Sequence, residues 1–207
     1  AHHQDDLYEN FFIRMLRGSG IRGLTSFSSD DTPLNDKLVG YRPFLNLTKN
    51  TLLKITNKVF GYYIKDPSNF NNEYLRIRVR NLIGNLQNEG FNKKKFDLTF
   101  CNLRSANESL KYYTNQNILK NTNFFKKNKK DNIVINIKFF YEPNEVVLRS
   151  LSNLISKTNK SYYFTRGRTL LKKIDEIRDI SFKKTTVGGC IIERINNTTL
   201  IYPENLK

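Results

Sequence analysis

Near its start the chain reads HHQDDLYENFFIRMLRGSGIRG, residues 2–23, a stretch that predicts one amphipathic helix followed by a glycine-rich turn. Asp5 and Asp6 fall in the expected first turn, where carboxylates complement the helix dipole, and Gly18 is a natural stop. We therefore expect a helix from Asp5 to Arg17. Its apolar positions recur at helical spacing, at Leu7 or Tyr8, Phe11 or Phe12, and Met15 or Leu16.

Two acidic side chains of this helix are candidates for chemistry. Asp6 and Glu9 lie three residues apart and therefore share one helix face. Converging carboxylates suit an ammonium group, a metal ion or acid–base catalysis. Acidic residues at a helix start more often serve only the helix dipole, and that alternative stays open.

A metal site is not expected from the sequence. His2 and His3 are adjacent, so they do not share a helix face as the H-E-x-x-H spacing of zinc sites requires. Cys101 and Cys190 are far apart and form no C-x-x-C pair. We therefore predict no metal-binding cluster among these side chains.

The composition points to an anionic partner. The 207 residues include 35 Lys and Arg against 19 Asp and Glu, for a net charge of +16 and an isoelectric point near 9.8. Such an excess favours nucleic acid as the partner. No apolar run reaches the ~20 residues that span a bilayer, and two distant cysteines fit a reducing compartment, so we expect a cytoplasmic protein without membrane contact.

Three blocks occur in an order and spacing that resemble one family. The first is His-His-x-Asp-Asp, Glu9 and Arg-Gly-Ser-Gly-x-x-Gly-Leu; the second is Arg42-Pro43-Phe44-Leu45. The third is Asp66-Pro67-Ser68-Asn69 with the arginine-rich segment 74–80. Together they resemble the tRNA(Ile)-lysidine synthases, which are PP-loop ATP pyrophosphatases that modify a tRNA anticodon. The strong part covers residues 1–86, and the turn at 186–190 is similar to one that closes the family's middle domain.

The resemblance implies an α/β fold that is mostly helical in this chain. Residues 1–86 would form the later half of a Rossmann-like PP-loop ATP-pyrophosphatase domain. Residues 87–207 would form a helical, substrate-side domain that ends in a β-hairpin.

The resemblance also implies an activity. Enzymes of this family use ATP and Mg²⁺ to adenylate C2 of the wobble cytidine of tRNA(Ile) with a CAU anticodon. The amine of free L-lysine then displaces AMP, which changes decoding from AUG to AUA. The resemblance leaves the oligomeric state open, a homodimer included.

Roles for particular residues follow from the same resemblance. Asp6 and Glu9 would bind the lysine substrate as counter-charges to its ammonium group and help to deprotonate the attacking amine. His2 and His3 would lie close to the nucleotide. The residues expected to contact phosphates of ATP or tRNA are Arg17, Gly18, Ser19, Gly20, Arg76, Arg78 and Arg80. For the three later arginines the alternative is a solvated face or ion pairs within the domain.

This sequence departs from the family pattern at several positions. Leu7 and Asn10 stand where a Gln and a Thr are usual, and Ile77 replaces an Asn. The pyrophosphate-binding Ser-Gly-Gly-x-Asp-Ser loop occurs nowhere in the 207 residues, so we expect an N-terminally truncated fragment that is inactive alone. The alternatives are a non-catalytic tRNA-binding remnant and a related PP-loop enzyme that thiolates tRNA, although the latter would need reactive cysteines.

The remaining periodicity predicts further elements. We expect a polar basic loop over Lys120–Asp131 and a strand over Ile133–Phe140. The aromatic and basic run at 162–168 is a candidate for RNA contact, with core packing as the commoner alternative. The other expected elements are a helix capped by Thr48 and ending at Gly61, helices over 75–86 and 96–119, a helix with Pro143 at its first position, a helix around 170–177 and a hairpin over 189–202.

Overall fold

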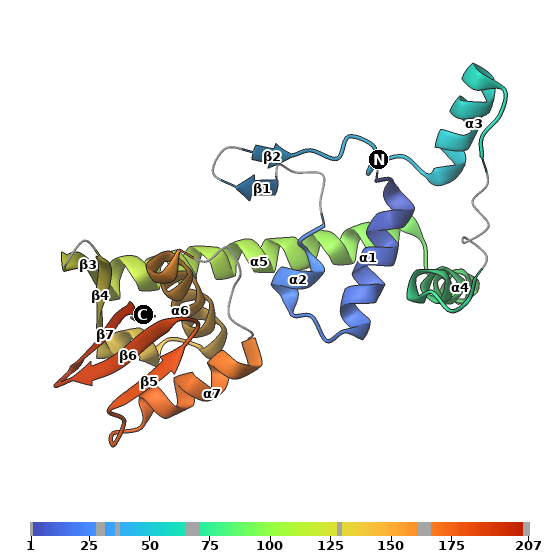
Figure 1. Ribbon diagram of the computed structural model, residues 1–207. Helices are drawn as coiled ribbons and strands as arrows, with labels where there is room; N and C mark the ends of the chain where they lie inside the picture. The colour runs from blue at the N-terminus through green and yellow to red at the C-terminus, as the bar shows by residue number, and fades with distance from the viewer. Residues whose placement is uncertain are drawn as a thin grey trace. The chain divides into compact units, whose positions relative to one another are not determined.

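The computed structural model describes residues 2–27, 32–35, 38–64, 71–127, 130–160 and 167–204. The chain forms two compact units, Ala1–Asn107 and Glu108–Lys207, and the long helix α5 (Lys93–Asn121) contributes residues to both (Figure 1). In the described ranges, none of the helices combines the length and apolar character needed to cross a bilayer.

The first unit is built around three helices that share an aromatic core. The predicted first helix is confirmed as α1 (Gln4–Leu16), and the arginine-rich segment forms α4 (Leu75–Asn88). Apolar residues of α1 and α4 pack against the first turns of α5, and the rings of Tyr8 and Phe96 lie edge to face at 4.5 Å. The buried members are Tyr8, Phe12, Val79, Ile83, Phe96 and Phe100.

The predicted helix after Thr48 is also confirmed, as α3 (Lys49–Phe60). The Thr48 hydroxyl accepts a hydrogen bond from the backbone N–H of Thr51, which satisfies one of the unpaired donors of the first turn. Gly61 ends the helix with a φ of +75°, a conformation that favours glycine. The remaining elements of this unit are short: α2 (Ile21–Leu24) and the antiparallel pair β1 (Thr32–Asn35) and β2 (Leu38–Gly40).

The second unit contains a five-stranded antiparallel sheet with strand order β3-β4-β7-β6-β5. Ile201 in the central strand lies opposite Ile133 on one side and Ile192 on the other, and all three are buried. Helix α6 packs on the strands that carry this row, and α7 packs beside α6. The bounds are β3 (Thr122–Lys127), β4 (Lys130–Asn136), the 3₁₀ helix η2 (Ile137–Tyr141), α6 (Asn144–Asn159), α7 (Gly167–Arg178), β5 (Lys184–Val187), β6 (Cys190–Ile195) and β7 (Thr198–Pro203).

Several expectations for this unit are wrong. The segment expected as a basic loop, Lys120–Asp131, instead contains the end of α5 and most of the hairpin β3–β4. The strand expected to reach Phe140 ends at Asn136, whose side chain accepts a hydrogen bond from the Lys138 N–H and so starts η2. The predicted C-terminal hairpin is confirmed as β6–β7, but it joins a larger sheet instead of closing a helical domain.

Beyond its first turns, α5 buries polar residues. Leu103 and Leu110 are only half-buried, and the buried positions carry polar side chains. Asn117 donates from its amide to the Phe139 carbonyl and the Ser150 hydroxyl, so its polar atoms are satisfied inside the unit. Apolar periodicity cannot reveal such a stripe, because its members are Asn107, Thr114 and Asn117.

The expected Rossmann-like arrangement is not seen in the described part of the first unit, where the only paired strands, β1 and β2, are antiparallel. The α/β content and the mainly helical character are confirmed. The block Asp66–Asn69 and most of the aromatic run at 162–168 lie outside the described residues.

Removal of the central isoleucine tests the core of the second unit. Ile201→Ala should lower the free energy of unfolding by about 2–5 kcal/mol, because it deletes buried methyl groups and leaves a cavity. Ile180→Ala is the control, since that side chain is 95% exposed, and it should change stability by less than about 0.5 kcal/mol. Urea unfolding followed by circular dichroism measures both; equal effects would contradict the assigned core.

Candidate functional site

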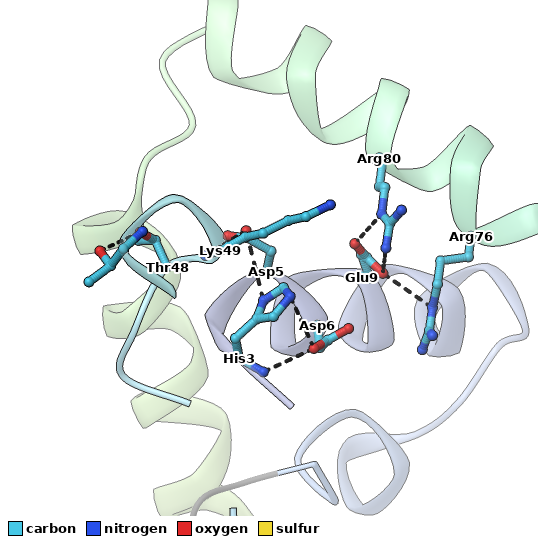
Figure 2. A network of polar contacts seen from close by, with 9 residues as sticks. His3, Asp5, Asp6, Glu9, Thr48, Lys49, Arg76 and Arg80 are labelled. Carbon is cyan, nitrogen blue, oxygen red and sulfur yellow. Dashed lines mark hydrogen bonds and ion pairs between the residues drawn. The ribbon is translucent and has the colours of Figure 1, made fainter. Parts of the chain in front are cut away.

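The first turn of α1 is tied to the segment that leads into α3. The backbone N–H of Gln4 donates to the Leu47 carbonyl at 2.9 Å, and that of Lys49 donates to Asp5 Oδ2 at 3.2 Å. The N-terminal ends of α1 and α3 therefore lie together, and α4 faces α1 from another direction (Figure 2). This junction gathers most of the candidate residues of the sequence.

Glu9 is the most buried acidic side chain of the junction and has two arginine partners. Its carboxylate, with only 3% of the side chain exposed, accepts from Arg80 Nε at 2.5 Å and Arg80 Nη2 at 3.4 Å, and lies 3.2 Å from Arg76 Nε. The i,i+4 spacing in α4 places both guanidinium groups on one face. Two cations sharing one carboxylate leave a formal surplus of one positive charge.

Asp6 lies on the same helix but makes different contacts. Its Oδ2 accepts from the backbone N–H of His3 at 2.9 Å and lies 3.5 Å from His3 Nε2. The carboxylate therefore closes the first turn of α1, a common role for an acidic third residue of a helix. The sequence pattern brings Asp6 and Glu9 to one helix, but their observed partners differ.

A cavity of about 310 Å³ opens beside Glu9. Its lining carries two carboxylates, Asp5 and Glu9, and two cations, Lys49 and Arg80. The Lys49 side chain extends toward Arg80 over this hollow (Figure 2). The charges are balanced, so the cavity suits a small ligand that carries both signs. The remaining lining residues are Tyr8, Asn50, Ile83, Gly84 and Gln87.

Tyr8 contributes an unusual polar group to this lining. The residue is 6% exposed, and its hydroxyl has no hydrogen-bond partner among the described residues. Burial raises the pKa of the Tyr8 phenol to about 12, and the carboxylates of Asp97 and Asp5 add to the shift. The hydroxyl is therefore held protonated as a potential donor.

The other predicted phosphate ligands already have structural roles. Arg78 donates through Nη1 to the carbonyls of Asn72 and Glu73, which secures the start of α4. In the turn after α1, the N–H groups of Arg17, Gly18 and Ser19 donate to carbonyls of the last turn of α1. Gly20 is the N-cap of the short α2. In this turn the exposed Arg17 side chain is the group best placed for a phosphate.

The histidines lie at the beginning of α1, and neither belongs to a metal cluster. His2 packs edge to face on Phe27 at 5.0 Å. His3 is half-buried, and its Nδ1 lies 3.8 Å from Asp5 Oδ2. Within the part of the chain that the structure describes, no group of three or more His, Cys, Asp and Glu side chains is arranged to hold a metal ion.

The two cysteines do not form a reactive pair. Cys101 is exposed in the first unit, whereas Cys190 is buried in the sheet of the second, where its thiol contacts the Ile155 carbonyl at 3.6 Å. Burial raises the pKa of the Cys190 thiol to about 11, with a smaller contribution from Glu204. A thiol held protonated is a poor nucleophile, so Cys190 does not favour sulfur transfer.

Comparison with known proteins shows what this site is similar to. The sequence model of the PP-loop domain matches residues 1–87, which carry the site. Across 99% of its length the chain is similar to proteins named tRNA(Ile)-lysidine synthase. It is 29% identical to the one from Wolbachia pipientis wMel, 31% identical to the one from Orientia tsutsugamushi and 32% identical to the one from Rickettsia typhi. The chain spans about half the length of these curated relatives, 46–47%. The suspected resemblance is therefore confirmed.

Several residues of this junction could not be predicted from the sequence. Lys49 and Gln87 reach the cavity from α3 and α4, far from Glu9 in sequence, so no local pattern links them. Asp5 was assigned only to the helix dipole, although it lines the cavity. Tyr8 was counted only as a core residue, and its spacing of three from Asp5 was the available signal.

Replacement of Tyr8 by phenylalanine tests the burial of its hydroxyl. Tyr8→Phe should leave stability unchanged or raise it at neutral pH, because it removes an unpartnered buried polar group. Tyrosine in the unfolded chain loses its proton near pH 10, while folded Tyr8 retains it to about pH 12, so wild-type stability should fall across this window. In Tyr8→Phe, the part of this decrease in stability that comes from Tyr8 should be absent.

Urea unfolding of both proteins below pH 10 and between pH 10 and 12 measures the difference. Tyr141→Phe, at a tyrosine that is 76% exposed, controls for the loss of any one phenol. A clear loss of stability in Tyr8→Phe at neutral pH would show that the hydroxyl has a partner after all.

Proposed function

We propose that this chain is part of an ATP-dependent carbon–nitrogen ligase that forms lysidine on tRNA(Ile). The observation that carries the proposal is the balanced cavity beside the Glu9–Arg76–Arg80 cluster, in a region that the sequence model of the PP-loop domain matches. Similarity to named tRNA(Ile)-lysidine synthases along nearly the whole chain supports it. Such an enzyme acts in the cytoplasm, where its tRNA substrate is found.

The cavity is proposed to bind free L-lysine. Asp5 and Glu9, the two carboxylates of its lining, would act as counter-charges to the ammonium groups, whereas Asp6 closes the first turn of α1 outside the lining. Lys49 and Arg80 would face the α-carboxylate. Carboxylates near the attacking amine also favour transfer of its proton, which the amine must lose as it bonds to C2 of the cytidine.

The surplus positive charge of the arginine cluster suits the other substrate. Arg76 is half-exposed while its Nε contacts Glu9, so its guanidinium lies at the surface of the cluster. A guanidinium group binds phosphate oxygens through paired N–H donors. We therefore propose that Arg76 contacts phosphates of ATP or tRNA and stabilises the charge that develops in adenylyl transfer, with Arg17 and Arg78 as weaker candidates.

No group of three or more His, Cys, Asp and Glu side chains in the described part of the chain is arranged to hold the Mg²⁺ that the family implies. Glu9 is shared by two arginines, and one oxygen of Asp6 is taken by the His3 N–H. We therefore assign no residue of this chain to the metal and derive no step through it.

Lysine incorporation tests the proposal directly. Incubation of the full gene product with labelled lysine, ATP and tRNA(Ile) with a CAU anticodon should transfer label to the tRNA. Glu9→Gln and Asp5→Asn should each raise the KM for lysine at least about tenfold, because each removes a charged hydrogen-bond partner of the ammonium group. Glu108→Gln, an exposed acid of the other unit, is the control. Lysine-dependent labelling with unchanged KM in both variants would refute the assigned pocket.

The arginine assignment has its own test. Arg76→Ala should weaken tRNA or ATP binding, and the dependence of log Kd on log salt should become shallower by about 0.7–0.9 if one phosphate contact is lost. Arg104→Ala, which removes the same charge elsewhere in the first unit, should leave the slope unchanged. Filter binding at several salt concentrations measures both, and an unaltered slope in Arg76→Ala would leave this residue a purely structural role.

A further inference from the structure

The edge of the sheet in the second unit carries an uncovered aromatic pair. Phe124 and Phe125, in the edge strand β3, are 47% and 40% exposed. Their cross-strand neighbours in β4, Ile133 and Asn132, are buried. The sheet and its helices therefore cover β4 but leave both phenyl rings of β3 in contact with solvent.

Two lysines lie beside this pair. Lys157 of α6 places Nζ 4.1 Å from the centre of the Phe124 ring, a cation–π contact with an exposed lysine. Lys126 follows Phe125 in the strand, and Asp131 of β4 lies opposite Lys126. Two lysines against one aspartate leave this surface with a positive excess.

A hollow of about 370 Å³ opens beside Phe124 and Phe125. Two lysines, Lys126 and Lys157, and one aspartate, Asp131, line it together with Asn132, Ile133 and Thr158. Exposed phenyl rings beside two ammonium groups match an unpaired nucleotide, whose base stacks on a ring and whose phosphates attract cations. An apolar peptide would not use the positive excess.

We propose that the edge of the β3–β4 hairpin, with Phe124, Phe125 and Lys126 of β3 and the neighbouring Lys157 of α6, binds unpaired nucleotides of RNA. The residues of this surface all belong to the second unit, whereas the cavity beside Glu9 is lined by residues of the first. The assignment of the RNA as the tRNA substrate rests on the proposed function, whereas binding of single-stranded RNA does not.

Fluorescence anisotropy with the full 207-residue chain tests this proposal. The probes are a fluorescein-labelled single-stranded RNA and a duplex that contains the same strand. Wild-type protein should prefer the single strand. The double substitution Phe124→Leu and Phe125→Leu keeps apolar side chains for packing but removes the stacking rings, and it should weaken single-strand binding about tenfold or more with little change for the duplex. Tyr141→Leu, at another exposed aromatic of the second unit, should bind as wild type.

The lysines are tested by the salt dependence of binding. Lys126→Ala with Lys157→Ala should make the slope of log Kd against log salt shallower by about 1.4, the value for two lost contacts to a single strand. Lys172→Ala with Lys183→Ala removes the same charge from exposed positions of this unit and should change the slope less.

If the leucine variant bound the single strand and the duplex as tightly as the wild-type protein does, the proposal would be overturned. Binding of vesicles containing phosphatidylserine that is lost in the same variants, without RNA binding, would also overturn it in favour of a membrane surface. Loss of RNA binding in the variants together with no lysidine formation by the wild-type gene product would support the hairpin and refute only the proposed function.

Discussion

The buried charge of Glu9 constrains the first unit more than any other single group. An ionised carboxylate removed from water is costly unless cations and hydrogen-bond donors surround it. Arg76 and Arg80 meet this need only when their face of α4 lies against α1. In the same register Val79 and Ile83 pack against the aromatic residues of α1. Apolar packing and charge pairing therefore select one arrangement of the two helices.

The second unit uses buried polar groups in a comparable way. Asn117 of α5 donates to the Phe139 carbonyl and to Ser150 of α6, and the Ser150 hydroxyl donates to the Thr114 carbonyl. Each of these atoms would lose a hydrogen bond if α5 rotated or slid relative to α6. The network fixes a register that the apolar contacts alone would leave less well defined.

Local signals made much of this structure predictable. Thr48 and Gly61 mark the two ends of α3. Gly188 and Gly189, both with positive φ, form the turn between β5 and β6. The hairpin β3–β4 was missed for a physical reason: its edge strand is exposed on both faces from residue 123 to 126, so it lacks the alternation of a half-buried strand. Its lysines suit an edge that must avoid pairing with other chains, but in sequence they resemble a loop.

The candidate site was predictable in its residue types but not in its partners. The sequence indicated converging carboxylates and an arginine face, yet pairing of Glu9 with α4 is a contact across 71 residues, which no spacing rule supplies. That pairing changes the chemistry of the pocket. Once Lys49 and Arg80 balance Asp5 and Glu9, the cavity contributes nothing to the net charge of +16. The excess must lie on other surfaces. A charge-balanced pocket suited to a small ligand that carries both signs is therefore distinct from basic surfaces suited to a polyanion.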